Sequence, residues 1–138
     1  MSAEENEAVV RRYIEECWND HDLANIDELV SSDYLNHAAS PDYQHGIAAV
    51  KHVMNWLFSV LPDHRFDVED AVAGGDRVAV RGTCSGTHEG ELWGMPPTGR
   101  TFRRPAGTYT DVRRSAVQAL ACFTVLRFNF TANRYRRS

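Results

Sequence analysis

The chain has 138 residues, of which 43% are hydrophobic and 25% are charged, and its formal net charge is −4. These values are typical of one globular domain, and the sequence shows no internal repeat, low-complexity tract or linker. No apolar run reaches the roughly 18 residues that a membrane helix needs, and the acidic N-terminal segment shows no signal-peptide pattern, so we expect a cytoplasmic protein without a membrane partner. Three widely separated cysteines, Cys17, Cys84 and Cys122, predict buried thiols in a reducing compartment and no disulfide framework.

Charge is distributed unevenly along the chain. Residues 1–99 contain 6 Lys and Arg residues against 18 acidic ones, whereas residues 100–138 contain 9 arginines and one aspartate. A basic half can indicate nucleic-acid binding. Here the arginines alternate with strand-like apolar residues and an acidic half is available to pair with them, so no nucleic-acid partner is expected. Residues 133–138, NRYRRS, are predicted to form a short basic tail.

Apolar residues at three- and four-residue spacing predict three helices in the first half of the chain. The predicted helices cover Glu4–Trp18, Leu23–Val30 and Ile47–Val60. Asn19 ends the first helix, Asp22 caps the second, and Pro62 stops the third. A short extended piece and a loop, SSDYLNHAAS, separate the second helix from the third.

After Pro62 the apolar period changes from about 3.6 to 2, which is typical of strands. Four strands are predicted over residues 64–73, 77–87, 100–112 and 115–130, with a hairpin turn at Gly74–Asp76. This order predicts a single α+β domain over residues 1–138, a cone in which the N-terminal helices pack on a strongly curved antiparallel sheet. The open end of such a cone can form a ligand pocket.

The stretch GTHEGELWGMPPTGR, residues 86–100, concentrates turn chemistry beside a large aromatic and a titratable ring. Its glycines allow sharp turns, and its two prolines stiffen the loop. If the loop covers the mouth of the cone, Trp93 and Met95 form its apolar underside and His88 is a polar group at the rim. The alternative is a plain hairpin connection in which Trp93 fills a gap in the core.

Four stretches carry a resemblance to a known family. Three of them cover about Val9 to Arg100: VVRRYIEECWNDHDLANIDELVSSDYLNH, GIAAVKHVMNWLFSVLPDHRFDVED and AGGDRVAVRGTCSGTHEGELWGMPPTGR. The fourth, Thr101–Asn129, matches in its strand pattern. Together they resemble the SnoaL-like polyketide cyclase family, within the nuclear transport factor 2-like superfamily. The resemblance implies a cone-shaped α+β barrel in which the loop over residues 86–100 caps a ligand cavity.

The resemblance also implies a reaction and some of its residues. Family cyclases close a ring by intramolecular aldol condensation, which needs a base to remove a proton beside a carbonyl and an acid to protonate the acceptor oxygen. The resemblance places His37 in the pocket, where its ring can accept or donate a proton near neutral pH. The neighbouring Asn36 can hold a carbonyl group. The family's catalytic carboxylate, the Asp of Trp-x-x-x-Asp, aligns with Thr124, whose hydroxyl cannot act as a general base at neutral pH.

Without that carboxylate, the catalytic candidates are His37, His88 and Asp70. Asp70 follows the inward alternation of the first predicted strand, where burying a carboxylate is costly and would indicate a function. The alternative for Asp70 is an ion pair with Arg81 or Arg103. The residues expected to contact substrate are Asn36, Trp56, Trp93, Met95 and Thr124.

Three functions fit these observations. The first is an enzyme that performs proton-transfer chemistry on a small hydrophobic carbonyl compound. No metal is expected, since the histidines lack ligand spacing, and no cofactor is expected, since no Gly-rich strand-to-helix turn suggests a nucleotide. The second is a non-catalytic binding protein for a small hydrophobic ligand. The third is a domain whose pocket is filled by Trp93, Phe102 and Phe123. In each case, apolar residues on both faces of the last two strands predict a homodimer through the outer sheet face.

Overall fold

The structure, a computed structural model, describes residues 2–36, 41–43, 45–113 and 116–122. The helical elements are α1 (Ala3–Tyr13), its π-helical continuation η1 (Ile14–Asn19), α2 (Ile26–Leu29), the 3₁₀ turn η2 (Pro41–Tyr43) and α3 (Gly46–Val60). The strands are β1 (Val30–Asn36), β2 (Arg65–Gly74), β3 (Arg77–Thr87), β4 (Thr101–Arg113) and β5 (Ala116–Cys122). The predicted α+β class is confirmed, and no helix of the described part is long and apolar enough to cross a bilayer.

The first helix is fixed at both ends by side chains. Ser2 accepts a hydrogen bond from the Glu5 backbone N–H at 3.1 Å, and acidic residues in the first turn complement the positive end of the helix dipole. At the other end, the Asn19 amide donates to the Phe66 carbonyl at 2.9 Å and accepts from the Phe66 N–H at 2.7 Å. Asn19 therefore joins η1 to the start of β2.

The sheet has five strands in the order β1-β5-β4-β3-β2. The four predicted strands pair antiparallel, whereas β1 joins the edge parallel to β5. A parallel pair needs a long crossover, which α3 and the intervening strands provide. The prediction of a helix over Leu23–Val30 was too long, because only Ile26–Leu29 is helical and the β-branched Val30 already begins β1.

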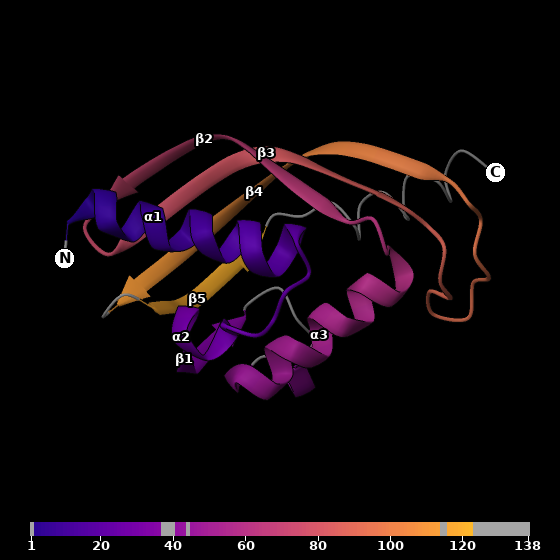
Figure 1. Ribbon diagram of the computed structural model, residues 1–138, viewed down its shortest axis with the longest axis horizontal. Helices are drawn as coiled ribbons and strands as arrows, with labels where there is room; N and C mark the ends of the chain where they lie inside the picture. The colour runs from indigo at the N-terminus through magenta and orange to yellow at the C-terminus, as the bar shows by residue number, and fades with distance from the viewer. Residues whose placement is uncertain (1, 37–40, 44, 114–115, 123–138) are drawn as a thin grey trace.

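The sheet is curled but not closed, and α1 and α3 lie on its concave side (Figure 1). A register irregularity between Val68 and Asp70 bends β2 beside β3. Gly82 of β3 permits this close approach, because a Cβ at that position would lie 2.1 Å from the Asp67 carbonyl oxygen. The curvature thus depends on a bulge in one strand and a glycine in its neighbour.

The outer face of the sheet carries a row of exposed apolar side chains. Val72, Ala79 and Tyr109 are neighbours across β2, β3 and β4, and Val72 is 68% exposed. The Tyr109 hydroxyl accepts a hydrogen bond from Arg77 at 3.1 Å, and Arg77 also pairs with Asp111 at 3.4 Å. The sequence predicts a homodimer through the outer sheet face, on which this row lies.

Candidate functional site

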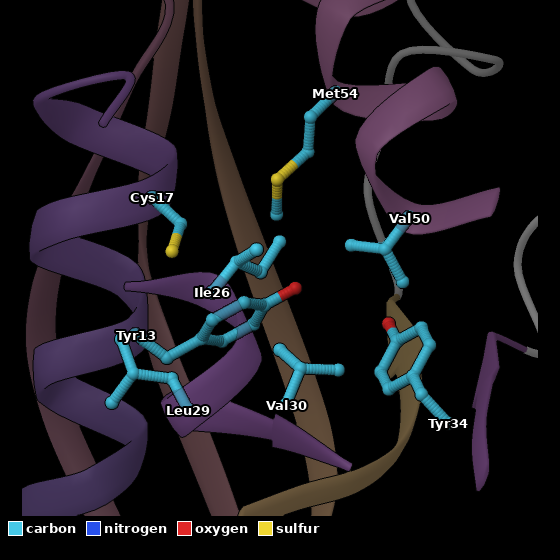
Figure 2. Close-up of a cluster of buried hydrophobic side chains, with 8 residues drawn as sticks. All are labelled: Tyr13, Cys17, Ile26, Leu29, Val30, Tyr34, Val50 and Met54. Carbon is cyan, nitrogen blue, oxygen red and sulfur yellow. The ribbon is translucent and has the colours of Figure 1, made fainter. Parts of the chain in front are cut away.

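The concave side of the molecule holds a buried cluster between α1, α2, β1 and α3 (Figure 2). Val50 and Met54 project from one face of α3, since residues four apart share a helix face. The members of the cluster are Tyr13, Cys17, Ile26, Leu29, Val30, Tyr34, Val50 and Met54. All but the two tyrosines end in apolar or thiol groups.

The two tyrosines bring hydroxyl groups into this apolar surrounding. Tyr13 extends from α1 and Tyr34 from β1, and each is only 1% exposed. Figure 2 shows both hydroxyls turned toward the region between Val50 and Val30. The Tyr13 hydroxyl lies close to the side chains of Trp18 and Tyr34, and both neighbours affect its ionisation.

The interior keeps Tyr13 neutral. Burial raises the pKa of the Tyr13 phenol well above its usual value of 10, because the phenolate would lose its hydration, and the nearby Tyr34 hydroxyl adds to the increase. A neutral phenol donates a hydrogen bond, so Tyr13 can bind an oxygen acceptor across the physiological pH range. Burial also raises the pKa of Cys17 to about 12, which keeps it a thiol and not a nucleophilic thiolate.

Asn36 lies two residues beyond Tyr34 on β1, and residues two apart in a strand share a face. Its side chain is buried, as the predicted role in holding a carbonyl requires. His37 and Thr124, the predicted base and the residue at the family's carboxylate position, lie outside the described residues. Their roles stay predictions.

Carboxylates are absent from the buried interior. All 19 aspartates and glutamates of the chain lie within the described ranges, and each of them is exposed or half-buried. The buried polar side chains of those ranges belong to Asn6, Asn36, His64, His88 and Thr110, besides the two tyrosines. Proton transfer in this interior therefore has to use groups other than a carboxylate.

The expected inward orientation of Asp70 was wrong. The bulge after Val68 interrupts the two-residue alternation, so the Asp70 side chain is exposed and accepts a hydrogen bond from the Ala71 N–H at 2.9 Å. Asp70 faces Arg81 across the ladder, but the ion pair of Arg81 is with Glu69 at 3.7 Å. The position offers no desolvated carboxylate.

His88 closes the base of the loop over residues 88–100. The ring is buried, its Nδ1 lies 3.0 Å from the Thr98 hydroxyl, and its backbone pairs with Arg100 and Gly99 at 2.9 Å each. The next two residues donate their N–H groups to the Val60 carbonyl at the end of α3. His88 thus holds the loop against the C-terminal end of α3.

Trp93 lies outside the core and is 74% exposed, so neither the loop-underside nor the core-filling interpretation was correct. Trp93 and Gly94 occupy the centre of a two-residue turn between Leu92 and Met95, with φ values of +46° and +83°. This turn buries Leu92 instead and places Trp93 against Trp56 of α3, with ring centroids 5.9 Å apart. Met95 is half-buried beside the same turn.

The candidate residues therefore fall into two separate groups. Leu35, beside Asn36, forms a bridge with His45 at the start of α3, whereas the His88 loop is bonded to Val60 at its end. A helix of 15 residues is about 22 Å long. Asn36 and His88 accordingly lie near opposite ends of α3 and cannot act on the same small chemical group.

A histidine to which the sequence assigned no role is also buried. His64 is 5% exposed, its Nδ1 lies 3.3 Å from the Trp18 carbonyl, and its Nε2 lies 3.4 Å from the Cys84 sulfur. Since a carbonyl only accepts, Nδ1 carries the proton and Nε2 accepts from the thiol. Burial lowers the pKa of His64 to about 4. His64 links η1, β2 and β3 as a neutral ring, and His21 supports it by contacting its carbonyl at 2.9 Å.

A groove of about 560 Å³ runs along the other side of η1, between this helix and the start of β2. Phe66 and Val68 contribute its apolar lining, and its rims are charged. Arg12 pairs with Glu16, and Arg65 pairs with Asp67 at 2.6 Å, so the charges compensate one another. The described ranges contain no group of three or more side chains that could hold a metal ion.

The described part of the chain is an α+β domain whose curled sheet covers an apolar interior with a few inward polar groups. The family model for the SnoaL-like polyketide cyclases matches residues 8–117. The chain therefore belongs to the SnoaL-like polyketide cyclase family. No curated protein sequence matches it.

Solved structures agree with this assignment. AclR, a proposed hydroxylase from Streptomyces galilaeus, is 25% identical, with a TM-score of 0.77 over 96% of this chain and 83% of AclR. IdmH, a proposed polyketide cyclase from Streptomyces antibioticus, is 27% identical, with a TM-score of 0.71 over 85% of this chain and 89% of IdmH. A SnoaL-like protein from a Jannaschia species has the same fold at 24% identity, with a TM-score of 0.80 over 94% of this chain and 92% of that protein. These relatives differ in proposed reaction, so the reaction has to be argued from the site.

Proposed function

We propose that this protein binds a small, largely apolar carbonyl compound in the interior between α1, β1 and α3, and catalyses proton transfer on it. Intramolecular aldol ring closure, which membership of a polyketide cyclase family implies, is one form of this chemistry. The observation that carries the proposal is the group of inward polar side chains, Tyr13, Tyr34 and Asn36, in an otherwise apolar cluster. Such a surrounding suits an apolar ligand with one or two oxygen atoms.

The reaction needs a base and an oxygen-binding acid. The hydroxyls and the amide supply hydrogen-bond donors for the oxygen. No buried carboxylate supplies the base, so the proposal assigns the base to His37, which follows Asn36 in the sequence. A neutral imidazole is a competent base near pH 7. Family members with a carboxylate at the Thr124 position are expected to be faster by about 10²–10⁴-fold, the usual contribution of general acid–base catalysis.

A second function, binding without turnover, is favoured by that same lack of a buried carboxylate. The two functions differ in whether the α-proton of a bound ketone exchanges with solvent. 1-Tetralone, a bicyclic ketone, is a suitable probe because it combines an apolar ring system with one carbonyl and acidic α-protons. Its exchange in deuterated buffer can be followed by proton NMR without knowledge of the natural substrate.

An enzyme is expected to accelerate the loss of the tetralone α-proton signal above the buffer rate, in a way that saturates with tetralone. Replacement His37→Gln should abolish the acceleration, while His45→Gln, a matched change at an exposed histidine beside α3, should preserve it. Saturable binding without acceleration would select the binding protein. Absence of any binding by tetralone and by larger polycyclic ketones would contradict both functions.

A further inference from the structure

The concave face of the sheet carries a charged side chain on β4. Arg104 lies directly opposite the buried Cys84 of β3, and residues opposite one another in an antiparallel pair share a face. The pairing of β3 with β4 has no register shift along its length, so the alternation of sides is not interrupted at Arg104. The other residues on this face of β2, β3 and β4 are apolar, cysteine, glycine or threonine.

Arg104 has no counter-charge among the described residues. None of their ion pairs includes it, although all 19 acidic side chains of the chain lie in the described ranges. The adjacent Arg103 is exposed on the outer face and is hydrated there, whereas Arg104 is half-buried. An unpaired charge that is partly withdrawn from water lowers the stability of a fold. Stability is commonly given up where a group acts on a ligand, and the remaining exposure of Arg104 shows that the side chain can be reached from solvent.

The same face of β4 continues with further hydrogen-bonding groups. Beyond the small Ala106 lie Thr108 and Thr110, which follow Arg104 at two-residue spacing. The hydroxyl oxygens of both threonines are buried, and within the described ranges they have no hydrogen-bond partner. β4 therefore directs a cation and two hydroxyls to the concave side of the sheet.

We propose that the guanidinium of Arg104 binds a carboxylate group of the ligand. This inference rests on the proposed function and narrows its ligand to a carbonyl compound that also carries an ionised acid group. Arginine stays protonated in proteins, and its planar fork of N–H donors matches the two oxygens of a carboxylate. One guanidinium balances one carboxylate, whereas a doubly charged phosphate would keep an uncompensated charge beside an apolar sheet face.

The carboxylate contact should strengthen binding by about 10- to 100-fold, the usual effect of a hydrogen bond to a charged group. Because Arg104 is half-buried, salt should screen part of this effect. Replacement Arg104→Met keeps a flexible apolar side chain and removes the charge. Arg103→Met is the matched control, because it removes the same charge one residue away on the outer face.

The test compares 4-carboxy-1-tetralone with its methyl ester, which has nearly the same shape and no charge, by isothermal titration calorimetry at pH 7. We expect the unaltered protein to bind the acid about 10- to 100-fold more tightly than the ester, and added salt to weaken only the acid. Arg104→Met should abolish this preference and keep the affinity for the ester. Arg104→Lys should keep part of the preference, and Arg103→Met should keep all of it.

Thermal unfolding without ligand provides a second readout. A ligand-binding role predicts an unchanged or higher Tm for Arg104→Met, whereas a lower Tm together with an unaltered acid preference would show a purely structural arginine.

Equal affinities for acid and ester in the unaltered protein would overturn the carboxylate site and leave the proposed function intact, because the neutral ester would still bind. Equal loss of the preference in Arg103→Met and Arg104→Met would assign it to the overall charge and would also overturn the site. Failure of the acid, the ester and 1-tetralone alike to bind would overturn both the site and the proposed function.

Discussion

Acid should destabilise this protein through His64. The pKa of the ring is about 4 in the folded chain and near 6.5 when it is unfolded, so below pH 6.5 the unfolded chain takes up a proton that the folded chain excludes. The contribution of the neutral His64 ring to the free energy of unfolding is fully present above pH 6.5. It decreases as the pH falls toward 4 and stays constant below the folded pKa. The difference between the two pKa values corresponds to about 3 kcal/mol.

The assay is urea unfolding of the unaltered protein and of His64→Gln at pH 7, 6, 5 and 4, with His45→Gln as the exposed-histidine control. At pH 7 His64→Gln should be less stable, since it loses the packing of the ring against Trp18 and Phe58. That deficit should shrink by about 3 kcal/mol between pH 7 and pH 4, because only the unaltered protein keeps the titrating ring. Carboxylates such as Asp63, whose pKa is lowered by hydrogen bonds from Thr87, are common to both chains. Parallel pH profiles for the two proteins would refute the assignment of a buried neutral His64.

Three further predictions concern the sheet and the last strand. Gly82→Ala should lower the free energy of unfolding by about 1–3 kcal/mol, because the new Cβ would lie 2.1 Å from the Asp67 carbonyl oxygen. Gly74→Ala, which has open space around it, should change this free energy little. Equal effects of the two substitutions in chemical unfolding would contradict the close approach of the two strands. Light scattering should show a dimer at micromolar concentration that Tyr109→Glu dissociates, and a monomeric unaltered protein would remove the outer-face contact. Thr124→Asp should raise ring closure of an anthracycline-type ester precursor by about 10²–10⁴-fold, and full activity in the unaltered protein would show that another residue carries the proton.

Most of the secondary structure could be predicted from the sequence because periodicity reports burial directly. The hairpin at Gly74–Asp76 and the full length of β3, Arg77–Thr87, follow from alternation and turn residues. The parallel strand β1 could not be predicted in this way, since its paired residues in β5 lie 84 to 87 positions further along the chain, as in Val30 with Val117 and Leu35 with Ala119, and short extended segments carry no signal of direction. The local sequence does not fix where α2 ends and β1 begins. The pairing of Val30 with Val117 of β5 sets this boundary.

The site was less predictable, because side-chain direction depends on small backbone irregularities. The bulge after Val68 directs the Asp70 side chain outward. In the loop, the positive φ values at Trp93 and Gly94 form a turn that exposes Trp93 and buries Leu92. Tyr13 and Tyr34 belong to no sequence motif, and Tyr13 matches the apolar period of its helix as any core aromatic does. The contact between His64 and Cys84 was also missed. His64 directly precedes β2 and Cys84 lies near the end of β3, so only the pairing of the two strands brings the side chains together.

The most direct test of the central claim is a ligand titration of protein labelled with ¹³C at the methionine methyl groups. The chain has three methionines, so the spectrum is simple: Met54 lies in the interior with no exposure, and Met95 lies in the loop beside Trp93. Binding of 1-tetralone in the interior predicts a saturable shift of the Met54 signal and intermolecular nuclear Overhauser effects to its methyl group. A ligand that shifts the Met95 signal and leaves Met54 unchanged would contradict the account, because binding would then occur at the loop surface and not in the interior beside Tyr13 and Tyr34.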